Sequence, residues 1–83
     1  MAEIRFTRRA LRDIRRLAPE VKRKIEITLD QLIDDPRSGD RLYGNWEGHW
    51  KLRTGDYRII YRIVDGATVE VQYVRHRRDA YRR

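Results

Sequence analysis

Cationic side chains recur at regular spacing in the second half of the chain. His49, Lys51 and Arg53 stand two residues apart, and Arg58 and Arg62 follow with a spacing of four. Every second side chain of a β-strand projects from the same face, so these residues share faces if the region forms strands. The planar guanidinium of arginine binds the oxygens of phosphate in a two-pronged manner. The spacing therefore favours a surface that binds phosphate.

The overall charge extends this argument to the whole chain. Its 83 residues include 20 lysines and arginines against 13 aspartates and glutamates, a formal net charge of +7. A basic chain in which arginine predominates favours nucleic acid as the partner. The alternative is a basic protein whose charges are only solvated.

The composition also excludes several classes of protein. The chain has no cysteine and only two histidines, which removes disulfides and thiolate metal sites and leaves little basis for a zinc site. We therefore expect no metal and no cofactor. No stretch approaches the ~20 apolar residues of a membrane span, and the N-terminus lacks the apolar run of a signal peptide. We expect a cytoplasmic protein without a membrane partner, folded as a single domain over residues 1–83.

Alternation of apolar and polar residues predicts the strands that carry the cations. Three strands are expected, joined by turns at residues 55–56 and around 65–66: Trp50–Thr54, Tyr57–Val64 and Thr68–His76. Before them, glycine, proline and asparagine in residues 36–48 predict an irregular connection. Leu42, Tyr43 and Trp46 are available to hold this connection against the rest of the protein.

The lengths of the two turns predict which residues face each other. A two-residue turn at 55–56 places Arg53 opposite Arg58, and a three-residue turn at 65–67 places Ile59 opposite Tyr73. The same register places Arg58 opposite Val74. One face would then be apolar, with Trp50, Leu52, Ile59, Tyr61, Ile63, Val69, Val71 and Tyr73. The other face would be basic, with His49, Lys51, Arg53, Arg58, Arg62 and His76, and with Ile60, Glu70, Gln72 and Val74 between them.

Arg53 opposite Arg58 is the informative pair, because like charges directly across two strands destabilise a sheet. An anion between the two guanidiniums would reverse the sign of the interaction. The alternative is a solvated face on which the guanidiniums point apart.

The first half of the chain predicts a strand and two helices. Glu3–Phe6 alternates as a strand, and Thr7 follows as a good N-cap. Two apolar stripes at helical spacing come next: Ala10, Leu11, Ile14, Leu17 and Ala18, then Val21, Ile25, Thr28, Leu29, Leu32 and Ile33. Pro19 suits the start of the second helix, and Pro36 its end. We expect an α+β fold, with an antiparallel helical hairpin packed on one face of a single antiparallel sheet.

Two segments resemble the signature motifs of RelE-type toxins in the RelE/ParE superfamily of type II toxin–antitoxin systems. They are residues 49–61, HWKLRTGDYRIIY, and residues 74–82, VRHRRDAYR; Leu42-Tyr43-Gly44 and the order of elements also match. The resemblance implies a metal-independent endoribonuclease that cuts messenger RNA, typically in the ribosomal A site, and so inhibits translation. It also implies a cognate antitoxin, and contact with operator DNA only through the complex with that antitoxin.

Carried over by the resemblance, the catalytic positions fall on Lys51, Arg58, Arg77 and Tyr81, with Arg53 as an adjoining phosphate contact. Lys51 would orient or activate the 2′-hydroxyl, while Arg58 and Arg77 would hold the scissile phosphate. Tyr81 would stack on a base or join the proton transfers. The alternative is that Tyr81 only docks the C-terminal tail.

Further candidates for binding RNA or phosphate surround these positions. Some family members carry a lysine where this chain has His49, so that residue could move protons, as could His76. If the alignment of the tail with the family motif shifts by one or two residues, Arg75 or Arg78 takes the role assigned to Arg77. Arg62 completes the set.

Two other functions remain as alternatives. ParE-type toxins share this fold and poison DNA gyrase without cutting RNA, although they usually lack a basic ending with a late tyrosine. A non-catalytic nucleic-acid-binding module would also explain the charge and the basic face. Substitution of Lys51 or Tyr81 would then change affinity only.

Overall fold

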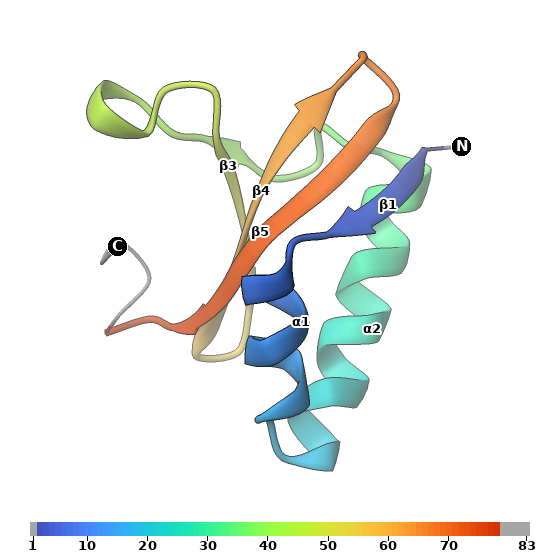
Figure 1. The fold of residues 1–83 in the computed structure, drawn as a ribbon, viewed down its shortest axis with the longest axis vertical. Helices are drawn as coiled ribbons and strands as arrows, with labels where there is room; N and C mark the ends of the chain where they lie inside the picture. The colour runs from blue at the N-terminus through green and yellow to red at the C-terminus, as the bar shows by residue number, and fades with distance from the viewer. Residues whose placement is uncertain (1, 79–83) are drawn as a thin grey trace.

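The computed structural model describes residues 2–78. Along the chain lie β1 (Glu3–Phe6), α1 (Arg8–Arg15), α2 (Pro19–Asp34), β2 (Asp40–Arg41), a short 3-10 helix (Gly44–Trp46), β3 (Trp50–Thr54), β4 (Tyr57–Val64) and β5 (Thr68–His76). The predicted α+β fold is confirmed, and both helices lie along the sheet (Figure 1). In the described part of the chain, neither helix has the length and apolar character needed to cross a membrane.

The order and direction of the strands differ from expectation in two respects. Within residues 2–78 the sheet has five strands in the order β1-β5-β4-β3-β2, because two residues of the predicted irregular connection pair with β3. The N-terminal strand β1 runs parallel to β5 (Figure 1), whereas an entirely antiparallel sheet was expected. Period-two alternation predicts a strand but carries no information on its direction.

The helical hairpin forms as its sequence predicts. The Thr7 hydroxyl accepts a hydrogen bond from the Ala10 amide at 3.0 Å, which caps α1, and Pro19 is the first residue of α2. The two helices and the sheet share one buried cluster: Ala10, Ile25, Leu29, Leu32, Ile59, Tyr61, Val69, Val71 and Val74. Leu11 and Ala18 are exceptions to the first predicted stripe, since both are exposed, Leu11 to 45%, while the charged residue Asp13 is buried.

The register between β3 and β4 is the predicted one, with Arg53 opposite Arg58. Between β4 and β5 it is correct only as far as Tyr61 opposite Val71, because a register shift follows at Ile60/Tyr61. An extra residue in one strand is a β-bulge. It leaves Gln72 without an opposing residue, so that Ile60 lies opposite Tyr73.

This bulge exchanges the faces of the residues that follow it. Val74 lies opposite Ile59 and joins the core, although it was predicted on the basic face. Tyr73 is buried as predicted, but it lies opposite Ile60 on the other face, outside the cluster shared with the helices. His76 was also predicted on the basic face, but it lies opposite Tyr57, and the two rings meet edge to face at 5.5 Å.

A buried tyrosine holds the connection between α2 and β3. The Tyr61 hydroxyl donates to the Pro36 carbonyl at 2.8 Å and accepts from the Gly39 amide at 3.3 Å. Burial raises the pKa of Tyr61 to about 12. Trp46 packs against Tyr73, with ring centroids 6.0 Å apart, whereas Tyr43 is 72% exposed and does not hold the connection.

Candidate active site

Three arginines lie in neighbouring positions on the three central strands of the sheet. Arg53 on β3 is opposite Arg58 on β4, and Arg58 is opposite Arg75 on β5. We call Arg53, Arg58 and Arg75 the arginine row. The backbone positions of this row point away from the core that the sheet shares with the helical hairpin, because the neighbouring row of Leu52, Ile59 and Val74 packs into that core and adjacent side chains of a strand alternate.

Arg58, at the centre of this row, has unused hydrogen-bonding capacity. Its Nη1 atom is buried and has no hydrogen-bond partner among the described residues. A buried donor without a partner is destabilising, and the flanking guanidiniums of Arg53 and Arg75 add like-charge repulsion. A phosphate oxygen on the row would satisfy the donor and offset the repulsion together.

Lys51 lies next to the arginine row on the same face of the sheet. It is opposite Ile60, which is in turn opposite Tyr73, and it is only partly exposed. An ammonium group two residues from Arg53 can contact the same phosphodiester as the row. The predicted proximity of Lys51, Arg53 and Arg58 is therefore confirmed.

An aromatic pocket lies beside His49, two residues before Lys51 in the chain. The pocket, about 340 Å³ in volume, is lined by Thr7, Arg9, Trp46, His49, Gln72 and Tyr73. The guanidinium of Arg9 lies 4.3 Å from the ring centre of Tyr73, a cation–π contact. The rings of His49 and Trp46 meet edge to face at 5.6 Å, and the His49 Nδ1 atom is buried without a hydrogen-bond partner in the described part of the chain.

The remaining predicted residues lie farther apart. Arg62 is opposite Glu70, on the other side of the bulge from the arginine row. The Nδ1 atom of His76 accepts from the Arg78 amide at 3.4 Å, and the Arg77 amide donates to the Asp56 carbonyl at 2.6 Å.

Both Arg77 and Arg78 are exposed at the end of β5. Tyr81 lies outside the described residues. Thus the structure brings together Lys51, Arg53 and Arg58, leaves Arg62 apart from them, and places His76 on the opposite face.

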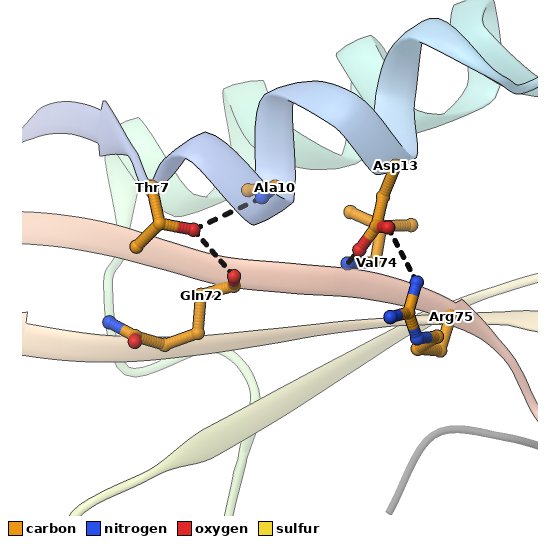
Figure 2. Close-up of polar contacts among 6 residues, drawn as sticks. All are labelled: Thr7, Ala10, Asp13, Gln72, Val74 and Arg75. Carbon is orange, nitrogen blue, oxygen red and sulfur yellow. Dashed lines mark hydrogen bonds and ion pairs between the residues drawn. The ribbon is translucent and has the colours of Figure 1, made fainter. Parts of the chain in front are cut away.

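The sequence-based prediction did not identify the positions of two residues, Arg75 and Asp13. Arg75 was predicted as a phosphate-binding residue and as a rival to Arg77, but not as the neighbour of Arg58, with which the bulge aligns it. Asp13 was not predicted at all, yet its carboxylate forms an ion pair with Arg75 (Figure 2). The consecutive large residues Tyr73 and Val74 interrupt period-two alternation, and this was the available signal for the bulge.

The site is rich in cations and offers electrostatic stabilisation of an anionic transition state. Among residues 2–78, no three histidine, cysteine, aspartate or glutamate side chains form a group that could hold a metal ion.

Comparison with known proteins finds similarity to toxins of toxin–antitoxin systems. The family model described as the ParE toxin of the type II toxin–antitoxin system parDE matches residues 4–81. Toxin RelG of Mycobacterium tuberculosis is 39% identical over 83 residues, covering 96% of this chain and 95% of that protein.

Solved structures agree with these sequence similarities. The RelBE2 toxin–antitoxin complex of Mycobacterium tuberculosis matches with a TM-score of 0.81 and 35% identity, over 90% of this chain and 96% of that chain. The isolated RelE toxin of E. coli matches with a TM-score of 0.80 and 25% identity, over 100% of this chain and 88% of that chain.

Proposed function

Because this chain belongs to the family of ParE toxins of type II toxin–antitoxin systems, we propose that it is a RelE-type toxin that cuts messenger RNA. It acts as a metal-independent endoribonuclease in the cytoplasm, in the ribosomal A site, and so inhibits translation. The observation that carries the proposal is the arginine row beside Lys51, with the buried and unpaired Nη1 atom of Arg58 at its centre.

The proposed reaction requires no redox change and no second substrate. The 2′-oxygen of a ribose attacks the adjacent phosphorus, and the bond from phosphorus to the 5′-oxygen breaks. The products are a 2′,3′-cyclic phosphate and a 5′-hydroxyl, and the proton lost from the 2′-hydroxyl is balanced by the one gained by the leaving oxygen. Negative charge accumulates on the phosphorane oxygens in the transition state, so cations fixed around them lower the barrier.

Each proposed role is supported by the residue's place on the sheet or by the family resemblance. Lys51 orients or activates the 2′-hydroxyl, and Arg58 and Arg53 bind the phosphorane oxygens. Arg77 and Tyr81 complete the site from the C-terminal residues, in the roles that the family resemblance implies. Arginine stays charged at every pH of interest, so Arg58 stabilises charge and does not donate a proton.

The proposed partners are the ribosome, messenger RNA and a cognate antitoxin. Support for the antitoxin comes from the similar solved structures, which include RelB–RelE complexes from Mycobacterium tuberculosis and E. coli. We propose that this chain is neutralised in a complex of the same kind, and that it contacts operator DNA only through that complex.

The family description also names ParE, which keeps the gyrase poison as the second candidate. Toxins RelG and RelE of Mycobacterium tuberculosis, at 39% and 34% identity, favour the ribonuclease.

The test expresses the chain from a tightly controlled promoter and maps the 5′ ends of messenger RNA by primer extension. The double variant Lys51→Ala, Arg58→Ala runs beside it. Arg23→Ala is the matched control, since it removes an exposed arginine from α2, away from the arginine row.

We expect new cuts in translated messages with the wild type and with Arg23→Ala, and none with the double variant. Cuts that vanish when the start codon is removed would establish the dependence on the ribosome. Growth arrest with intact messages and broken DNA would contradict the nuclease and support the gyrase poison. Unchanged cutting by the double variant would contradict the assigned site.

A further inference from the structure

The outer edge of β5 changes partners halfway along the strand. Up to Val71 the strand pairs with β1, and the Thr7 amide then donates to the Val71 carbonyl at 3.1 Å. Beyond that point, side chains of Thr7 and α1 replace the backbone of β1. The Thr7 hydroxyl donates to the Gln72 carbonyl at 2.6 Å, and Asp13 Oδ2 accepts from the Val74 amide at 3.1 Å (Figure 2).

Asp13 does more than satisfy this strand edge. The residue is only 8% exposed, and a buried carboxylate is strongly destabilising unless it is paired. The Val74 amide requires only a neutral acceptor, which an asparagine would provide equally well. The negative charge is explained by the second oxygen, Oδ1, which accepts from Nη1 of Arg75 (Figure 2).

The ion pair fixes an arginine that would otherwise be repelled by its neighbours. Arg75 is directly opposite Arg58 in the arginine row. Its guanidinium lies toward Asp13 and 5.7 Å from the ring centre of Tyr73, and its side chain remains 31% exposed. One end of the guanidinium is therefore anchored, while part of the side chain can still meet a ligand on the open face.

We propose that Asp13 is a positioning residue that fixes the guanidinium of Arg75 at the α1 edge of β5, so that Arg75 acts as a fixed phosphate-binding cation of the arginine row. This inference rests on the proposed function and adds Asp13 to its site. Asp13 acts on the site through Arg75, because it lies on α1 at the edge of the sheet and its carboxylate contacts β5. An arginine held in place loses less conformational freedom when it binds RNA than a mobile one does.

A double-mutant cycle on the full chain tests this dependence. Asp13→Asn keeps an acceptor for the Val74 amide but removes the charge that holds Arg75, and Arg75→Ala removes the cation itself. We expect each single variant to lower kcat/KM for RNA cleavage about 10-fold, the scale of one charge-assisted hydrogen bond. The double variant should be no worse than Arg75→Ala alone, because Asp13 has no effect without Arg75.

Thr7→Val is the matched control. It removes the neighbouring side-chain contact between this segment and β5 without touching Arg75. Its effect should add to that of Arg75→Ala, as expected of a residue that caps α1 and supports the strand without contacting Arg75. If Asp13→Asn and Arg75→Ala also add fully, Asp13 has a structural role and the proposal is wrong.

Two further measurements do not depend on cleavage. The side-chain Nε–H signal of Arg75 in NMR spectra should be resolved in the wild type and broadened by exchange in Asp13→Asn. Binding of a 2′-O-methyl RNA oligonucleotide, which cannot be cut, should weaken about 10-fold in Asp13→Asn, by fluorescence anisotropy. An unchanged Arg75 signal and affinity would overturn the inference. A wild type that binds this RNA but never cleaves RNA would overturn the proposed function alone.

Discussion

The two halves of β5 are held in different ways. The first half, Thr68–Val71, pairs with β4 on one side and with the parallel strand β1 on the other. The second half begins at the bulge, and its outer edge is closed by Thr7 and Asp13 (Figure 2). The first half carries Glu70 opposite Arg62, whereas the second carries Arg75 opposite Arg58.

This difference shows how one strand can serve both stability and chemistry. Backbone pairing depends little on which side chains are present, so the first half is secured by many sequences. Side-chain contacts depend on particular residues, and they can determine the direction in which a neighbouring arginine side chain points. The second half therefore tolerates like charges that would be unfavourable in an ordinary ladder.

The largest expected effect distinguishes Arg58 from Arg62, the two arginines of β4 that lie opposite the two halves of β5. Arg58→Ala should lower the rate of RNA cleavage about 100- to 1000-fold, the scale observed when one stabilising group is removed from an anionic transition state. Arg62→Ala, opposite Glu70, should lower it less than about 10-fold. Single-turnover kinetics on a short RNA would measure both variants. Equal losses would mean that the arginine row has no special role.

A smaller effect tests whether both halves share one core. Val71→Ala and Val74→Ala should each lower the free energy of unfolding by about 1–3 kcal/mol, since both side chains are buried in the same cluster. Urea denaturation would measure the two values. A neutral Val74→Ala would show that the second half is not packed on the helices, contrary to the observed register.

The side-chain contacts at the edge should contribute less. Thr7→Val removes both the N-cap of α1 and the hydrogen bond to the Gln72 carbonyl, and should lower stability by about 1–2 kcal/mol. Thr28→Val is the control, because within residues 2–78 its hydroxyl donates only to the Lys24 carbonyl of its own helix. Equal losses in the two variants would indicate that the contact with β5 contributes nothing.

The smallest effect concerns Tyr61, which is opposite Val71 in the first half. Its pKa rises from 10.0 to about 12 on burial, so the folded protein holds the proton more tightly than the unfolded chain. Stability is unaffected below pH 10 and decreases as the pH rises from 10 toward 12. The free energy of unfolding of Tyr61→Phe should decrease less over this range than that of the wild type, when both are measured at pH 9, 10 and 11. Parallel curves for the two proteins would contradict this assignment.

Much of the sheet could be predicted because local signals determine it. The two-residue turn at 55–56 defines the register of β3 and β4 and therefore places Arg53 opposite Arg58, as observed. The helix boundaries followed from Thr7, Pro19 and Pro36. These signals act within a few residues of the structure that they specify.

The errors arise where distant segments meet. The bulge at Gln72 is accompanied by contacts from Thr7 and α1, about 60 residues away in sequence, and no local pattern of β5 contains that information. Asp13 was missed for a related reason. A charged residue among arginines on a helix is usually solvated, and its burial becomes visible only when Val74 and Arg75 lie beside it.

The shortness of β2 has a consequence for how the protein behaves in a concentrated solution. Open sheets can join edge to edge through their unpaired backbone groups and so form aggregates. Here the outermost strand next to β3 is Asp40–Arg41, and both of its residues are charged and exposed. Glu3 and Arg5 place exposed charges on the strand at the opposite edge. Both borders of the sheet thus oppose edge-to-edge pairing with another copy of the chain.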